Sequence, residues 1–392
     1  MTGSPSPSAV DLALDPLPGR SLHDVLEAAR RDGPVSEAVF LGAPAVIVTG
    51  FEDLRGFFTA EDQFPGGAAY RIHTEPAVGR TFISMDGAEH TTYRRLTTPA
   101  FRSRATARFV DEALVPLVHE IVDGFAADGR ADLVARVARV LPFWAISRKL
   151  GLPLGTEDRQ RRWALALLSY PRDPEGAGRA SREVTAFLEP IVESLRHDPG
   201  DDVISHLLSA EHDGTRLTDD EVFSHIRLLY AVGATTTSDA MSSLFRVVLS
   251  DPDLLDRARE EPAVRPRIVE EVLRYEPPVA ILPRLAPVEG EISGVRVAPG
   301  TVVLGAIAAA NRDPDVFAEP DAFDPDRHEP DILTFGFGPK FCPGSHLARR
   351  QLLAALEVVV ERLRGLRLVS TTEPAGAVLR SVESVIAEWE PT

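Results

Sequence analysis

One long helical pattern constrains the fold of this 392-residue chain more than any other feature of its sequence. Thr218 supplies an N-cap, and Glu221 three residues later completes a capping box. The pattern continues to Ser250, where Asp251–Pro252 ends it. A helix of about 32 residues is roughly 48 Å long, so it can cross a whole molecule of this size. We therefore predict a fold built around one central helix whose middle is buried.

The centre of this helix contains residues that weaken it. The stretch YAVGATTTSD, residues 230–239, holds Gly233 and the three threonines Thr235, Thr236 and Thr237. Against alanine, these four residues cost roughly 2–3 kcal/mol, whereas a protein's total stability is about 5–15 kcal/mol. Two explanations are open. Gly233 could allow close helix packing while the hydroxyls bond to carbonyls one turn earlier, or the helix could widen to hold a polar ligand or water.

The remaining periodicity predicts a mainly α fold with a small β portion. Helical patterns dominate from about Asp53 to Tyr275. Two strands are predicted at residues 35–42 and 45–50, and GVRV, the turn APG and TVVLGAI predict a hairpin within residues 294–307. A last long helix begins just after Cys342.

Glycine and proline clusters predict the irregular segments. Residues 64–81 are expected to form one long loop, which in a compact domain is usually functional, and residues 169–180 a break between two helices. The polar, proline-rich start predicts a disordered tail over residues 1–19, followed by a single domain over residues 20–392.

Composition excludes several classes of function. The net charge of −17 argues against a nucleic-acid surface, and no apolar run reaches the roughly 20 residues of a membrane span. The N-terminus does not have the pattern of a signal peptide, so a cytoplasmic protein is expected, and we expect a monomer. Because Cys342 is the one cysteine, the chain cannot form an internal disulfide or a multi-cysteine metal site.

The stretch TFGFGPKFCPGSHLAR around Cys342 is the most informative motif. Glycines allow tight turns that bring amide N–H groups to the sulfur, and the following helix adds partial positive charge. Both effects favour a thiolate, which suits a soft metal and above all haem iron. An inert buried cysteine remains an alternative, and so does a nucleophile paired with His346, four residues on.

The pattern F-G-x-G-x-x-x-C-x-G, which includes Phe335, Gly336, Cys342 and Gly344, resembles the cysteine-ligand loop of the cytochrome P450 family, the haem-thiolate monooxygenases. Further resemblances follow over most of the chain, from about Val35 to the C-terminus. They are an E-x-x-R pair at Glu271 and Arg274, an arginine that joins this pair at Arg327, and haem-propionate partners at His90, Arg94 and Arg284. The resemblance implies a single triangular domain with haem b between the central helix and the helix after the cysteine loop, and with Cys342 as the iron ligand.

The threonine stretch is similar to the family's oxygen-binding motif, A-G-x-[D/E]-T-T. The resemblance implies that Gly233 opens the helix for dioxygen and that Thr236 hydrogen-bonds the oxygen and helps to deliver protons. The chain departs from the pattern in two places. Thr235 replaces the usual acid, so Asp239, a water chain or a substrate hydroxyl would have to take over proton delivery. Lys340 stands where the family usually has His or Arg, and it still offers a cation to a propionate.

The resemblance implies that the chain inserts one oxygen atom from O2 into a hydrophobic substrate such as a terpenoid, steroid, fatty acyl or polyketide compound of bacterial secondary metabolism. Electrons would come from a ferredoxin and its reductase, which Arg102, Arg104 and Arg350 would attract, unless these are solvated charges. The alternatives are a peroxide-using or non-oxidative haem enzyme, a haem-binding sensor with little catalysis, and a thiol hydrolase.

The substrate pocket is expected to have small apolar walls. A lid would come from the break at 170–180 and from the loop with Tyr70, Arg71 and His73, where Arg71 or His73 would meet a polar end of the substrate. The expected pocket residues are Tyr230, Ala231, Ala234, Val279, Ala280, Ile281, Leu282 and, near the C-terminus, Val382 to Val385.

Overall fold

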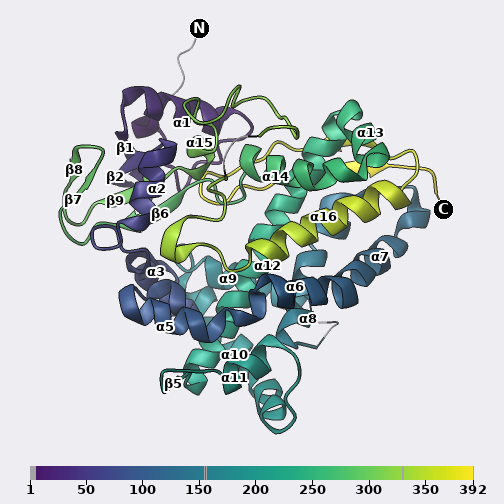
Figure 1. Cartoon of the computed structure of the whole chain (residues 1–392), viewed down its shortest axis with the longest axis horizontal. Coiled ribbons are helices and arrows are strands. Elements are labelled where there is room, and N and C mark those ends of the chain that lie inside the picture. Colours follow the sequence, from purple (N-terminus) through teal and green to yellow (C-terminus); the bar gives the residue numbers. More distant parts are fainter. Residues whose placement is uncertain (1–5, 154, 156, 329–330, 392) are drawn as a thin grey trace.

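The computed structural model describes residues 6–153, 155, 157–328 and 331–391 (Figure 1). Within these ranges most of the chain is helical, as the sequence predicts. The helices are α1 (Ser21–Asp32), α2 (Phe51–Thr59), α3 (Gly67–His73), α4 (Glu75–Val78), α5 (Gly87–Thr97), α6 (Ser103–Phe109), α7 (Val115–Asp123), α8 (Leu141–Leu150), α9 (Glu157–Leu168), α10 (Pro174–His197), α11 (Val203–Ser209), α12 (Asp219–Ser250), α13 (Pro252–Glu260), α14 (Arg265–Tyr275), α15 (Ile307–Ala310) and α16 (Ser345–Arg362).

Short strands form the small β portion, and in Figure 1 the largest sheet lies beside α1 and α2. That sheet has the order β1-β2-β9-β6, in which β2 and β9 are parallel and the other pairs antiparallel. A second sheet has the order β10-β11-β3, while β4 pairs with β5 and β7 with β8. The strands are β1 (Val35–Phe40), β2 (Ala43–Val48), β3 (Arg130–Asp132), β4 (Glu211–His212), β5 (Thr215–Arg216), β6 (Leu282–Leu285), β7 (Gly290–Ile292), β8 (Val295–Val297), β9 (Val302–Gly305), β10 (Arg367–Thr371) and β11 (Val385–Glu388).

The central helix α12 begins and ends where the sequence predicts. The Thr218 amide donates to Glu221 Oε2 at 2.8 Å and the Glu221 amide to Thr218 Oγ1 at 3.3 Å, so the capping box is formed. The helix runs to Ser250 without interruption. It crosses the middle of the molecule and packs against α8, α9 and α16 (Figure 1).

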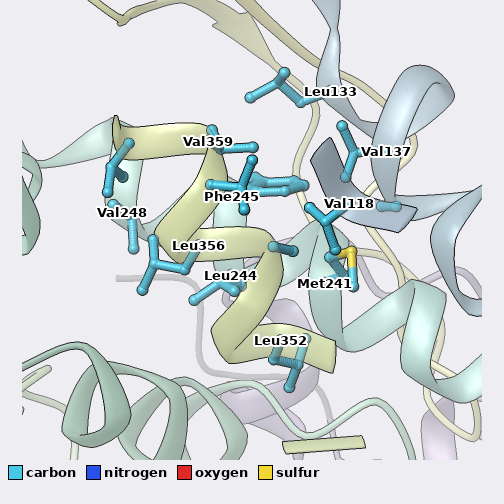
Figure 2. Close-up of a cluster of buried hydrophobic side chains, with 14 of the residues drawn as sticks. Val118, Leu133, Val137, Met241, Leu244, Phe245, Val248, Leu352, Leu356 and Val359 are labelled. Carbon is cyan, nitrogen blue, oxygen red and sulfur yellow. The ribbon is translucent and has the colours of Figure 1, made fainter. Parts of the chain in front are cut away.

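The C-terminal half of α12 lies in the largest hydrophobic cluster. Figure 2 shows Met241, Leu244 and Phe245 of α12 beside Leu352 and Leu356 of α16. Each of these side chains is at most 1% exposed. Burial of this kind stabilises a protein by roughly 1.5–3 kcal/mol for each large apolar side chain, and it fixes α16, and therefore the loop that precedes it, against α12.

A buried arginine network ties α14 to the irregular segment that follows α15. Arg274 is 1% exposed and forms two hydrogen bonds with Glu271, from Nε at 2.8 Å and from Nη2 at 2.7 Å. Arg327 adds a third contact, from Nε to Glu271 Oε1 at 3.3 Å. The expected grouping of Glu271, Arg274 and Arg327 is therefore present in the structure.

Three segments differ from the sequence-based expectation. The stretch 64–81 is not one long loop, because it contains the short helices α3 and α4. The break between α9 and α10 covers only 169–173, because Asp173 caps α10 and Pro174 fits its first turn. Of the expected tail, residues 1–5 lie outside the described residues, but Leu12 is fully buried and Leu17 is 7% exposed.

The expected hairpin between GVRV and TVVLGAI is wrong. Strand β8 pairs with β7 through a tight turn at Ser293 and Gly294, whose φ angles of 49° and 80° suit a two-residue hairpin. Strand β9 instead pairs with β2 and β6 in the larger sheet. In the part of the chain that the structure describes, none of the helices combines the length and apolar composition needed to cross a membrane.

Candidate functional site

The loop before α16 holds Cys342 in a tight backbone fold. The Cys342 amide donates to the Phe335 carbonyl at 2.8 Å, which closes the loop on itself. Gly336 and Gly338 have φ angles of 73° and 71°, a conformation that residues with a Cβ rarely adopt. A Cβ on Gly344 would lie 3.8 Å from the Cys342 sulfur, so the backbone passes close to that atom.

Several positive groups face the sulfur of Cys342. Burial raises the pKa of the thiol, and the Gly344 amide, the Arg94 and Arg349 guanidiniums and the Ser345 amide oppose that rise. Arg349 is itself held by Glu270, from Nε to Oε1 at 2.6 Å, and by the Phe335 ring, whose centroid is 4.3 Å away. Burial outweighs these contributions, so the pKa of the thiol is raised overall; the neighbouring positive charges and amides are nevertheless the groups that would stabilise a thiolate bound to a metal.

Four basic side chains, Arg94 among them, gather near the loop. They come from separate elements, with His90 and Arg94 on α5, Arg284 on β6 and Lys340 within the loop. Burial and the Lys340 and Arg94 charges lower the pKa of His90 to about 4. Burial raises the pKa of Tyr70. The Arg284 charge acts against this rise and Cys342 adds to it, so the phenol lies within electrostatic range of both groups.

These side chains are held mainly by backbone carbonyls. Arg94 donates to the Phe341 carbonyl, Arg284 donates to the Phe64 carbonyl at 2.8 Å, and Lys340 donates to the Met85 carbonyl. Lys340 also lies 3.4 Å from Asp86 Oδ1. None of the first three contacts neutralises a positive charge, so the group retains the capacity to bind an anion.

Two buried nitrogen atoms in this group lack partners. Among the described residues, neither His90 Nε2 nor Arg284 Nε has a hydrogen-bond partner. An unsatisfied buried donor costs about 1–3 kcal/mol, so such atoms are usually satisfied by a ligand. A buried cysteine near Arg94, Arg284 and Lys340, with the neutral His90 as a further hydrogen-bonding group, fits haem, whose iron takes a thiolate and whose two propionates take cations and N–H donors. His90, Arg94, Arg284 and Lys340 would hold the propionates, and Cys342 the iron.

The threonine stretch of α12 supports the first of the two explanations given for it. The hydroxyls of Thr235, Thr236 and Thr237 donate to the carbonyls four residues earlier, at 2.9, 2.9 and 3.1 Å. A Cβ on Gly233 would lie 3.3 Å from Ile146 Cδ1 on α8, so the glycine allows close packing there. The expected local widening is absent from α12, all of which the structure describes, because the hydroxyls supplement its hydrogen bonds without displacing them.

A cavity of about 730 Å³ lies against this part of α12. We call it the α12 cavity. Thr235, Ser238 and Asp239 form its α12 wall. Burial raises the pKa of Asp239 to about 7, although the Arg139 charge lowers it. Further lining residues include His73, Phe143, Arg139, Arg161, Leu165, Leu168, Ser169, Arg172, Pro283 and residues 13–16 and 375–379.

The predicted pocket residues do not line the α12 cavity. Tyr230, Ala231 and Ala234 are buried in a hydrophobic cluster, because these positions of α12 face α8. Ala280 and Ile281 are fully buried in a second cluster, and the remaining ones are also part of packed clusters. Those remaining residues are Val279, Leu282, Val382 and Val385.

The predicted lid contributes in part. His73, Pro171 and Arg172 line the α12 cavity. Arg71 does not, because it pairs with Asp86 at 2.9 Å and with the Ser84 carbonyl at 2.7 Å. The expectation that Arg71 meets the substrate therefore conflicts with its contacts. His346 is exposed and makes no hydrogen bond with Cys342 in the described structure, so the Cys–His pair is not formed.

Sequence reasoning missed two side chains of this region, Arg139 and Arg161. They lie just before α8 and on α9, and they approach each other only in the folded chain. No motif marks them, because isolated arginines in helical segments are normally solvated. Ser238 was also missed, although its position three residues after Thr235 places it on the same helix face.

Comparison with known proteins agrees with this geometry. The family model described as Cytochrome P450 matches residues 177–374. The chain is 31% identical over 317 residues to the putative cytochrome P450 YjiB of Bacillus subtilis (strain 168), covering 79% of this chain and 80% of that protein. It is 34% identical over 340 residues to mycinamicin IV hydroxylase/epoxidase of Micromonospora griseorubida, covering 83% and 84%.

Solved structures share the fold. P450BioI in complex with hexadec-9Z-enoic acid ligated acyl carrier protein superposes with a TM-score of 0.85 and 25% identity, covering 93% of this chain and 97% of that one. The chain belongs to the cytochrome P450 family and is a haem-thiolate monooxygenase.

Proposed function

We propose that this monooxygenase hydroxylates a largely hydrophobic organic compound of bacterial secondary metabolism and takes its electrons from a ferredoxin and ferredoxin reductase. The cysteine loop carries the proposal, since Cys342 lies within electrostatic range of Arg94 and Arg349, and His90 within range of Lys340 and Arg94, which supports a haem site. The α12 cavity supports the hydrophobic substrate, because Phe143, Leu165 and Leu168 contribute apolar walls to it. The similarity to mycinamicin IV hydroxylase/epoxidase supports a large secondary metabolite.

The side chains of the chain have separate tasks in this proposal. Haem, when bound, supplies the activation of O2, and the protein positions substrate, moves protons and excludes water. Cys342 would ligate the iron, while His90, Arg94, Arg284 and Lys340 would bind the propionates. Thr236 would hydrogen-bond the dioxygen. Asp239 would exchange protons near it, because a carboxyl with a pKa of about 7 can both take up and release a proton at neutral pH.

The spectrum of the reduced, carbon-monoxide-bound protein tests the assignment of Cys342. The wild type is expected to show the red-shifted Soret band of a thiolate ligand, and Cys342→Ser is expected to lose it because an alcohol oxygen is a poor iron ligand. Ser345→Ala is a matched control, since Ser345 is a buried neighbour at the start of α16. A red-shifted band in Cys342→Ser, or a wild type that binds no haem, would contradict the proposal.

A further inference from the structure

A second, cationic cavity, which we call the outer cavity, shares two lining residues with the α12 cavity. This outer cavity has a volume of about 630 Å³ and is lined by Arg139, Val140, Trp144, Gly155, Asp158, Arg159, Arg161 and Arg162. Arg139 and Arg161 line both cavities, so they stand at the boundary between them. Among the described residues, four arginines and one aspartate line the outer cavity, in a protein whose net charge is −17. The charge of this region is thus opposite to that of the protein as a whole.

The two boundary arginines lack the partners that other buried arginines of this protein have. Arg274 is bound to Glu271, and Arg380, which is fully buried, is bound to Glu276 and to the Leu17 carbonyl. By contrast, neither Arg139 nor Arg161 forms an ion pair or a side-chain hydrogen bond with any residue that the structure describes. Both are half-buried, so their guanidinium groups lose hydration without receiving a compensating contact.

The positive charges of the two arginines also repel each other. Burial and the Arg139 charge lower the pKa of Arg161, whereas Asp158 raises it. Asp239 lies within electrostatic range of Arg139, but the two side chains form no ion pair within 4.0 Å, and Asp239 has a pKa of about 7, so it is only partly ionised at neutral pH. The cationic boundary is therefore not neutralised by the protein, which is the usual state of a binding site for an anion before the anion arrives.

The apolar lining of the α12 cavity indicates the chemistry of the ligand beyond its anionic group. Besides Arg139 and Arg161, Phe143, Leu165, Thr235 and Pro283 line the α12 cavity. A ligand anchored at the arginines would thus place its apolar body beside the threonine stretch of α12. Guanidinium groups recognise a carboxylate through paired N–H···O contacts, which adds direction to the charge attraction.

We propose that the substrate is an amphiphilic carboxylic acid whose carboxylate is bound by Arg139 and Arg161 and whose apolar body lies in the α12 cavity beside Thr235. This inference rests on the proposed function, because it specifies the substrate class of the same site. It moves the polar anchor of the substrate from Arg71, which the structure shows paired with Asp86, to the boundary of the two cavities.

Calorimetric titration of the holoenzyme at pH 7.5 with matched probes tests the proposal. The probes are dodecanoic acid with 1-dodecanol, lithocholic acid with its methyl ester, and 2-naphthoic acid with 2-naphthylmethanol, so that three body shapes are covered. In at least one pair the acid is expected to bind about tenfold or more tightly than its neutral partner. Added salt is expected to weaken binding of the acid but not of the neutral probe.

Variants separate the two arginines from general charge effects. Arg139→Gln and Arg161→Gln are each expected to lower the affinity for the acid about tenfold or more and to leave that for the neutral probe unchanged. Arg161→Lys keeps the positive charge but not the two parallel N–H donors of the guanidinium, so its affinity for the acid is expected to fall less than that of Arg161→Gln. Arg162→Gln is the control, because Arg162 lies on the same helix, is exposed and lines only the outer cavity.

Each remaining outcome has a defined meaning. Equal affinity within all three pairs, no binding by any acid, an acid preference that survives both glutamine variants, or binding that requires a thioester on a carrier protein would overturn the proposal. The carbon-monoxide spectrum, recorded on the same preparations, reports failure of the haem-thiolate function separately. Calorimetry does not depend on that spectrum, so an acid preference can be established or refuted in either case.

Discussion

Asp239 is an ionisable side chain of α12 that faces the α12 cavity, and burial raises its pKa to about 7. Arg139 and Arg161, from the segments packed against it, and His73 line the same cavity. An ordinary aspartate has a pKa near 4, so between about pH 4 and pH 7 the folded protein holds a proton here that the unfolded chain has lost. The free energy of unfolding therefore falls as the pH rises through this range, because ionised Asp239 is a buried charge.

Asp239→Asn is expected to remove this pH dependence. The variant should gain stability relative to the wild type as the pH rises from about 4 to 7, with a plateau above, on the order of 2–4 kcal/mol. Thermal unfolding of both proteins at pH 5 and pH 8 measures the difference. Asp62→Asn, at an exposed position, is the control. A stability difference that does not change between the two pH values would show that Asp239 is an ordinary carboxylate.

Thr236→Ala tests proton delivery at the same helix. The resemblance assigns this task to Thr236, although Thr235 is the threonine that lines the α12 cavity. Once a ligand screen has supplied a substrate, the variant is expected to release more hydrogen peroxide and less product for each NADPH consumed. Thr237→Ala is the control, since its hydroxyl makes the same type of bond, to the Gly233 carbonyl at 3.1 Å. If Thr236→Ala still forms product in proportion to the NADPH consumed and Thr235→Ala does not, Thr235 and not Thr236 is the proton-delivery residue.

At the scale of elements, two helical glycines illustrate what close packing requires. Gly56 in α2 is exposed, and an added Cβ would meet no atom within 4 Å. Gly233 in α12 would bring its Cβ to 3.3 Å from Ile146 Cδ1 and 3.4 Å from Ile146 Cγ1. Replacement by alanine would thus add helix propensity at both sites, but it would add a steric conflict only at Gly233.

Gly56→Ala is expected to stabilise the protein by about 0.5–1 kcal/mol, the usual difference between glycine and alanine inside a helix. Gly233→Ala is expected to lose this gain or reverse it, because Ile146 has to move by a few tenths of an ångström. Differential scanning calorimetry of the two variants measures the contrast. If Gly233→Ala stabilises as much as Gly56→Ala, close packing against α8 is not the reason for the glycine.

The elements also show why some predictions succeed and others fail. The ends of α12 were predictable because Thr218, Glu221 and Pro252 act within one turn of the helix. The partner of β9 was not, because β9 pairs with β2, which is more than 250 residues earlier in the chain. Local signals identify turns and caps, whereas strand pairing depends on which surfaces meet after the helices have packed.

The site follows the same division. Cys342 and its glycines form one contiguous motif and were predictable, and so were the charged pairs that the family resemblance supplies. Arg139 and Arg161 were not, because their significance is that they have no partner among the described residues, and only the folded structure shows which side chains come near them. The same holds for the pocket walls, since Tyr230 and Ala231 belong to a helix face that packs on α8.

At the scale of the whole molecule, the surface near the cysteine loop carries positive charge. Arg102, Arg104 and Arg350 are exposed, and α6, which follows Arg102, packs against α16, which carries Arg350. None of the three has an ion pair with another described residue, in a protein whose net charge is −17. An acidic ferredoxin would thus meet a locally cationic surface on an otherwise acidic protein.

Charge reversal tests this docking surface. Arg102→Glu, Arg104→Glu and Arg350→Glu are each expected to slow reduction by ferredoxin several-fold at low salt, with a smaller effect at high salt because charges are screened. Arg296→Glu on β8 is the control, since it is exposed and changes the net charge equally. Stopped-flow reduction under carbon monoxide measures the rate. An equal slowing by the control would show that only the net charge matters.

The segment ahead of α1 forms one wall of the α12 cavity. Residues 13–16 and 375–379 both line it. The two segments are neighbours, because the Gly376 amide donates to the Pro16 carbonyl at 2.6 Å and the Gly19 amide donates to the Pro374 carbonyl at 2.8 Å. Arg380 donates to the Leu17 carbonyl at 3.0 Å. A recombinant version trimmed to begin at residue 20 would therefore lack this wall of the α12 cavity, and a bulky purification tag fused close to Ala13 would lie beside it. The first residue of an expressed version therefore affects how compounds reach the α12 cavity of this enzyme.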